Sequence, residues 1–286
     1  GNGGGFGLQQ ARIPNDDVYI GIKRGETITC LPFFGDVKPV ELESFLGEQE
    51  SIVETQLQAY AEEDIHRIHQ WGSDRWQAPG VEFTLYTPVD GIPDPKQADE
   101  AAFKQSINPA ILAQLTIDNS DGKEAIQGIF ALKGIHGKRP LVEESDGKLM
   151  GWVGKDGFGF ACSTAENPTA MAASHHDMGT MFTPPHPSSF RLGAISALIV
   201  DVPAGEKKTV DIALGWYVKG IATFGQLEMP YAYTEYYNGV VDVLSSALSD
   251  KEDILAETDR VNQQLANSGL NIDQQFMIAE ATSSYW

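Results

Sequence analysis

The sequence predicts a mainly β protein: a large antiparallel β-sandwich followed by helices. Three observations support this fold class. Many short segments are rich in β-branched and aromatic residues, turn residues separate these segments, and the pattern changes to helical spacing towards the C-terminal end. An apolar fraction of 42%, with 9% aromatic residues, is sufficient for a packed core.

The strands give the clearest local signal. Segment 81–87 alternates apolar and polar residues, which is typical of a strand with one buried face. The sequence predicts a strand at 110–117, a turn at 118–122 and a second strand at 127–132. We expect these two strands to pair as a hairpin. Further strands are expected at 18–22, 148–153, 157–161, 194–202 and 209–218.

Helices are expected after Tyr231. From there to Asn267 the chain has no proline, Gly239 is its single glycine, and apolar residues recur at helical spacing: Val241, Leu244, Leu248, Ile254, Leu255, Val261 and Leu265. Gly269 stands where a helix ends, and Asn271 with Gln274 resembles a capping box that begins another helix. Because that helix reaches Trp286 without a stop signal, we expect the natural polypeptide to continue.

The charge balance excludes some classes of partner. Twenty Lys and Arg against forty Asp and Glu give a net charge of −20. Binding to nucleic acid or to an anionic membrane surface needs concentrated positive charge, so neither partner is expected. The longest apolar stretch, 194–200, is also far shorter than the ~20 residues of a membrane helix.

Cofactor and compartment signals are weak. Cys30 and Cys162 are too few for a disulfide framework, and the chain has no signal peptide as it stands, so a cytoplasmic location is expected. The glycines at 1–7 do not match G-x-G-x-x-G, and neither a P-loop nor G-x-S-x-G occurs. We therefore expect no cofactor.

Several strings, taken in order, resemble one enzyme family. They are 82–89 with 92–95, 115–119 with Gly122, 193–194 with 197–209, and 273–277. The 197–209 string is the most specific of them. Together they resemble the N-terminal region of glycoside hydrolase family 52, the bacterial β-xylosidases, from about Gly4 to Trp286, with a poor match at 38–62.

The resemblance implies a two-part enzyme. It implies a β-sandwich domain at 1–228, a helical linker at 229–270 and, at 271–286, the first helix of an α/α barrel that is otherwise missing here. In such retaining enzymes a nucleophile and an acid/base carboxyl lie roughly 5 Å apart. The family carries both acids in the barrel, so no catalytic residue is assigned to this chain.

The implied partners follow from the same resemblance. They are the chain's own barrel, a β-xyloside or xylo-oligosaccharide substrate, and a second copy in a homodimer. The sugar stays open between xyloside and glucoside, because specificity would lie in the barrel.

One histidine-rich segment is a candidate for the rim of an active site. It contains His175, His176, Asp177 and His186. A metal site is disfavoured, because adjacent histidines point in opposite directions in an extended chain. The remaining interpretations are a loop that reaches substrate and an ordered polar loop with no ligand.

Aromatic residues supply the other candidates. Trp76 and Trp152 could stack on a sugar, although most tryptophans in a sandwich are core residues. Tyr231, Tyr233, Tyr236 and Tyr237, with Phe224, are expected to form a contact where the sandwich gives way to helices.

The sequence supports one main hypothesis and two alternatives. The main hypothesis is the N-terminal β-sandwich of a retaining β-xylosidase-like hydrolase, which packs on and shapes the barrel and is inactive alone. The alternatives are an autonomous, lectin-like carbohydrate-binding sandwich and the same architecture in a β-glucosidase.

Overall fold

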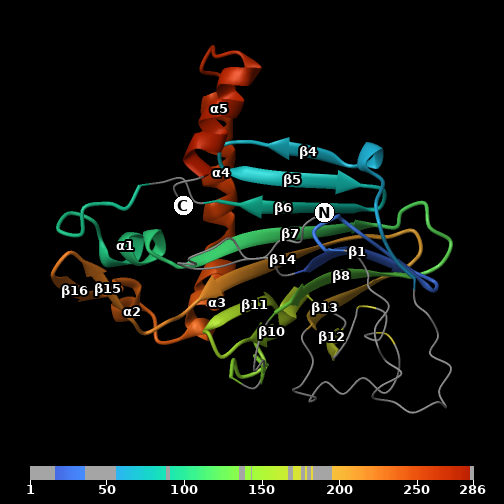
Figure 1. The fold of residues 1–286 in the computed structure, drawn as a ribbon, viewed down its shortest axis with the longest axis horizontal. Coiled ribbons are helices and arrows are strands. Elements are labelled where there is room, and N and C mark those ends of the chain that lie inside the picture. The colour runs from blue at the N-terminus through green and yellow to red at the C-terminus, as the bar shows by residue number, and fades with distance from the viewer. Residues whose placement is uncertain are drawn as a thin grey trace.

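Two large β-sheets pack face to face and form the body of the protein (Figure 1). This computed structural model describes residues 17–35, 56–87, 91–134, 139–142, 144–166, 170–174, 178, 182 and 195–283. One sheet has six strands in the order β12-β13-β8-β1-β2-β3, and the other has eight in the order β4-β5-β6-β7-β14-β11-β10-β9. A separate two-stranded sheet pairs β15 with β16.

The six-stranded sheet comprises β1 (Val18–Arg24), β2 (Thr27–Cys30), β3 (Gln56–Ala59), β8 (Ile126–Lys133), β12 (Ala170–Ser174) and β13 (Ile195–Val202). The eight-stranded sheet comprises β4 (His66–His69), β5 (Ser73–Ala78), β6 (Val81–Tyr86), β7 (Ala110–Asp118), β9 (Arg139–Pro140), β10 (Leu149–Val153), β11 (Phe158–Ser163) and β14 (Lys207–Trp216). The small sheet is β15 (Ile221–Phe224) with β16 (Leu227–Pro230). Among the described pairs, β2 with β3 is parallel and the others are antiparallel.

Five α-helices complete the described fold: α1 (Glu100–Ser106), α2 (Tyr233–Tyr236), α3 (Val240–Ser249), α4 (Lys251–Ala266) and α5 (Ile272–Ser283). Two short 3₁₀ turns lie at Glu62–Asp64 and Thr164–Glu166. In Figure 1, α3 and α4 run across the eight-stranded sheet, and α5 projects beyond its β4 edge. No helix in the described part of the chain is both long and apolar enough to cross a membrane.

Most sequence predictions of elements are confirmed. Each predicted strand is present, and the mainly antiparallel β architecture with C-terminal helices is observed. The capping box before α5 is reciprocal: Gln274 N donates to Asn271 Oδ1 at 3.0 Å, and Asn271 N donates to Gln274 Oε1 at 3.1 Å. Gly269 has φ of 77°, as a residue that ends a helix requires.

The predicted hairpin of 110–117 with 127–132 is wrong. Strand β7 belongs to the eight-stranded sheet and β8 to the six-stranded sheet, so the intervening turn crosses between sheets. Both strands bury one face in the same core, Leu115 and Ile117 from one side and Phe130 and Leu132 from the other. Local turn chemistry is the same for a hairpin and for such a crossing, so the turn alone could not distinguish them.

The main core lies between the two sheets. Alternate residues of β14 point into it, including Val210, Ile212 and Leu214. Phe130 stands at its centre, 5.9 Å from the ring of Phe83 and 5.3 Å from the ring of Phe160. Cys30 and Cys162 are both buried and free, so the described core contains no disulfide between them.

The outer face of the eight-stranded sheet is covered by α3. The outward residues of β14 include Ala213 and Gly215, whose small size lets the helix approach closely. A Cβ atom at Gly215 would lie 2.8 Å from Cγ1 of Val243, a distance that real contacts do not reach. Val243 and Leu244 are fully buried there. Helix α3 therefore forms a third layer over the sandwich.

Asn119 joins two crossings between the sheets. Its side-chain nitrogen donates to the carbonyl oxygens of Glu124 at 2.9 Å, Val202 at 3.2 Å and Pro203 at 2.9 Å. Its backbone N–H donates to Glu206 O at 2.9 Å. The residue is 2% exposed, so one buried amide fixes both the β7–β8 and β13–β14 corners.

We predict that Asn119→Ala lowers the free energy of unfolding by about 2–4 kcal/mol, because three carbonyl oxygens lose a buried donor. Denaturant titration followed by circular dichroism measures this change. The control is Asp121→Asn, an exposed residue in the same turn, which should stay within about 0.5 kcal/mol of the parent chain. Equal stabilities for the two variants would contradict the assigned role.

Candidate functional site

The histidine-rich candidates cannot be placed. His175, His176, Asp177 and His186 all lie outside the described residues. Their proposed place at the rim of an active site therefore stays a prediction.

Trp152 is a core residue. It is 2% exposed, and its Nε1 donates to Ala197 O of the opposite sheet at 3.0 Å. Because the ring is enclosed between the two sheets, it offers no open face to a sugar, and its candidacy as a stacking platform is corrected.

Three side chains of the chain lie against the ring of Trp76. The ring of Phe83 stacks on it at 6.2 Å, and Phe33 approaches it edge-on at 5.2 Å. The Arg67 guanidinium lies 5.4 Å from the ring centroid. Trp76 is half-buried in this arrangement, and its platform role stays a prediction that would require Arg67 to move.

The tyrosine cluster joins α1 to the chain that follows β14. Tyr231 and Tyr233 stack at 5.6 Å, and Tyr233 Oη both donates to Val218 O at 2.9 Å and accepts from Val218 N at 3.2 Å. Tyr237 Oη donates to Lys104 O of α1 at 3.0 Å. We call the unit formed by α1, the β15–β16 hairpin and α2 the arm (Figure 1).

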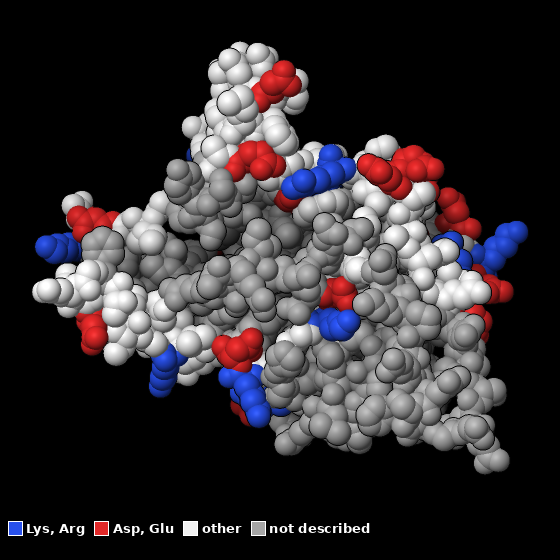
Figure 2. Space-filling model, viewed as in Figure 1, with Lys and Arg blue, Asp and Glu red and all other residues white. Residues whose placement is uncertain are grey.

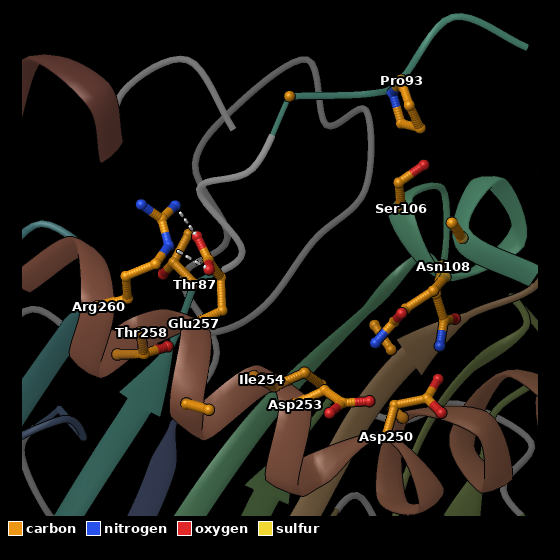
Figure 3. Close-up of a pocket in the computed structure, with 16 residues that line it drawn as sticks. Thr87, Pro93, Ser106, Asn108, Asp250, Asp253, Ile254, Glu257, Thr258 and Arg260 are labelled. Carbon is orange, nitrogen blue, oxygen red and sulfur yellow. Dashed lines mark hydrogen bonds and ion pairs between the residues drawn. The ribbon is translucent and has the colours of Figure 1, made fainter. Parts of the chain in front are cut away.

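A cavity of about 610 Å³ lies between the arm and α4. Helix α1 contributes Gln105 and Ser106 to its wall, and the segment 250–260 contributes Asp250, Asp253 and Glu257. Figure 3 shows the acids on the α4 side and Ser106 with Asn108 across from them. This volume is within the range of small-molecule sites.

The chemistry of the cavity is that of hydrogen bonding. Glu257 is paired with Arg260, whose Nε lies 2.6 Å from its Oε2, and Asp250 accepts from Ser246 Oγ at 3.1 Å. Carboxylates and amides of this kind can bind hydroxyl groups, but the described residues of the lining include no aromatic ring for sugar stacking. Among the described residues, no group of three His, Cys, Asp or Glu side chains could hold a metal ion.

A partly buried polar network lies where α4 begins. Lys251 Nζ lies 2.5 Å from Asp211 Oδ2 and 3.4 Å from Glu166 Oε1. Glu166 Oε2 accepts the backbone N–H of Asp211 at 2.9 Å, and Gln114 Nε2 donates to Asp211 Oδ1 at 2.8 Å. The network continues to Tyr86, whose Oη donates to Gln114 Oε1 at 2.5 Å.

The pKa shifts in this network have clear causes. The hydrogen bond to Asp211 raises the pKa of Lys251, and the nearby carboxylates reinforce it. Burial raises the pKa of Glu166, with a further contribution from the negative charge of Asp211. Lys251 is paired with both carboxylates, and neither Glu166 nor Asp211 lines the cavity. These ion pairs therefore attach the start of α4 to the sheet.

A second attachment holds the other half of α4. Asn262 Oδ1 accepts from Gly72 N at 2.9 Å, and Asn262 Nδ2 donates to Ser73 Oγ at 3.1 Å. A Cβ atom at Gly72 would lie 2.9 Å from Cγ2 of Val261, so the helix rests directly on the β4–β5 turn. No local pattern indicates this contact, because the two residues are 190 positions apart in the sequence.

His69 lies between the edge strand and α5, and neither of its buried ring nitrogens has a hydrogen-bond partner among the described residues. Its Nδ1 lies 3.3 Å from Asp74 Oδ2, and its Nε2 lies 3.6 Å from Glu280 Oε1 of α5. The Phe276 ring packs edge-on against it at 6.0 Å. His66 lies in the same strand, β4.

Comparison with known proteins identifies the family. The glycosyl hydrolase family 52 model matches residues 1–286, so the chain belongs to this family. A β-xylosidase of Geobacillus stearothermophilus is 31% identical over 296 residues, covering 100% of this chain and 41% of the relative. Another from the same organism is 27% identical over 315 residues, covering 100% of the chain and 48% of the relative.

The match also places the chain within the longer proteins. It spans less than half of the length of these relatives and corresponds to their N-terminal part. The resemblance read from the sequence strings is thereby confirmed.

We predict that Lys251→Met destabilises the fold by about 1–3 kcal/mol at pH 7, because two partly buried carboxylates lose their cation. Without the ammonium the already raised pKa of Glu166 rises further. A carboxyl whose pKa is higher in the folded state favours folding as the pH falls, so the deficit should shrink between pH 7 and ~pH 5.

Urea unfolding of parent and variant across this pH range tests the prediction. The contribution of Lys251 itself should not change in that range, because its raised pKa means that it is lost only in alkaline solution. Lys207→Met is the matched control, since Lys207 is 58% exposed and contacts Asp118 at the surface. A deficit that is the same at both pH values would argue against charge burial as its cause.

Proposed function

We propose that this chain is the N-terminal β-sandwich region of a retaining β-xylosidase, that it packs on and shapes the catalytic part, and that it is inactive alone. The observation that carries the proposal is the family match over the whole chain, combined with coverage of 41% of a β-xylosidase. The whole-chain match and the 41% coverage are both consistent with catalytic residues that lie in the part of the relative that this chain does not match.

Three acids of the described chain, Glu166, Asp211 and Glu257, support the proposed division of labour. A retaining mechanism needs a free nucleophilic carboxylate and a protonated carboxyl that face a common sugar. Glu166, which is partly buried, and Asp211, which is buried, are both paired with Lys251 at the start of α4. Glu257 of the cavity is paired with Arg260. These acids are engaged in holding the fold.

The proposed substrate is a β-xyloside or a xylo-oligosaccharide, bound by the complete enzyme. Both curated relatives bear the name β-xylosidase, which favours a xyloside over a glucoside. The lectin-like alternative has lost one of its two supporting tryptophans, because Trp152 is enclosed in the core.

We predict that the chain alone hydrolyses an aryl β-xyloside no faster than a buffer blank. A fusion of this chain to the part of the 31%-identical Geobacillus relative that follows the matched region should show turnover. The intact relative is the positive control, and release of the aryl group is the measurement. Turnover by the isolated chain would refute the proposal, and so would a folded fusion with no activity.

A further inference from the structure

We propose that the outward apolar face of the β15–β16 hairpin is the anchor through which this chain docks on the catalytic part of the same polypeptide. This inference rests on the proposed function, since it names the surface through which the sandwich would meet its partner. The relevant residues are Ala222, Leu227 and Met229, and we call them the hairpin face.

The two sides of the hairpin differ in charge, and both carry exposed apolar side chains. The register pairs Ala222 with Met229 and Thr223 with Glu228, so alternation places these two pairs on opposite sides of the ribbon. Leu227 lies on the same side as Met229. Leu227 is 61% exposed and Met229 is 50% exposed, so large apolar side chains stand in solvent on that side. The side of Thr223 and Glu228 also carries Ile221, which is 62% exposed, whereas the hairpin face carries no charged residue.

An isolated hairpin of this length needs a packing partner. Two strands of four residues are marginal in water by themselves, because they bury too little apolar surface to offset the loss of conformational entropy. The paired sheet has no third strand among the described residues. A surface that covers the hairpin face would supply the missing burial.

The base of the hairpin is already held rigidly. Tyr231, directly after β16, stacks on Tyr233, and a Cβ atom at Gly220 would lie 2.9 Å from the Tyr231 ring. Tyr233 in turn bonds both backbone groups of Val218, just before β15. A hairpin fixed at its base and apolar at its outer half is preorganised for binding, which reduces the entropy lost on docking.

The occupant that best fits is the remainder of the family 52 polypeptide. The chain corresponds to the N-terminal part of relatives of which it covers 41% and 48%, so more than half of each relative is available to cover this face. The arm emerges from adjacent strands β7 and β14 and forms one wall of the cavity against α4, so the hairpin face and the cavity lie at the same end of the sheet (Figure 1).

A second copy of this chain fits less well. Two copies would each carry a net charge of −20, and their mutual repulsion opposes association. On the face shown in Figure 2, the described Lys and Arg side chains stand singly or in small groups among Asp and Glu. A second copy is therefore treated as an alternative outcome of the test.

Thiol labelling can test the proposal at single residues. Cys30 and Cys162 are both buried, so a cysteine introduced on the hairpin would be the accessible thiol of the described chain. The probe position is Leu227→Cys, and the matched control is Glu228→Cys on the opposite face of the same strand. Both side chains are exposed, so both variants should fold.

The measurement is the rate of maleimide labelling in the chain alone and in the Geobacillus fusion defined above. We expect Leu227→Cys to react at least about tenfold more slowly in the fusion, and Glu228→Cys to change by less than about twofold. Equal labelling of Leu227→Cys in both proteins would overturn the docking proposal. If that fusion still hydrolyses an aryl β-xyloside, the proposed function is unaffected.

The other outcomes are also decisive. Concentration-dependent protection of Leu227→Cys in the chain alone would identify a second copy as the occupant and overturn the proposal. Protection in a folded but inactive fusion would support docking and refute the proposed function. Should the fusion fail to fold, cysteines at the aligned positions of the intact Geobacillus relative, with its own accessible cysteines replaced, give the same test.

Discussion

The outer face of the eight-stranded sheet imposes the constraint on which the other features depend. It presents the small residues Ala213 and Gly215 beside the carboxylate of Asp211, which is 7% exposed. Apolar side chains must cover the first two, and a cation must compensate the third. Helix α3 supplies Val243 and Leu244, and Lys251 at the start of α4 supplies the charge. One strand therefore fixes the positions of two helices.

The positions of these helices determine where the cavity and the hairpin face lie. Helix α4 is fastened at Lys251 and again at Asn262, so it forms a rigid wall opposite α1. The tyrosines of the arm hold α1 and the hairpin on the other side. The cavity and the exposed hairpin face therefore result from the way these helices cover the sheet. Both lie at one end of the sandwich, where a partner could bind.

The candidate site was much harder to predict than the fold. Alternation at 81–87 and the capping box at Asn271 are local signals, and both were confirmed. Helix α1 was missed, although Asp99 caps it by accepting from Ala102 N at 2.9 Å, because seven residues carry too little periodicity. Trp152 was proposed for a sugar platform because its residue type suits either role, and its burial is decided by the opposite sheet.

The sequence by itself determined the family, the strands and the C-terminal helices, because these depend on residues close together in the chain. The three-dimensional structure decided that β7 and β8 lie in different sheets, that Lys251 meets Asp211 and Glu166, and that Asn262 meets Gly72. These contacts join residues that are far apart in sequence. They form when whole sheets and helices pack together, and no local pattern records which distant surface a side chain will meet.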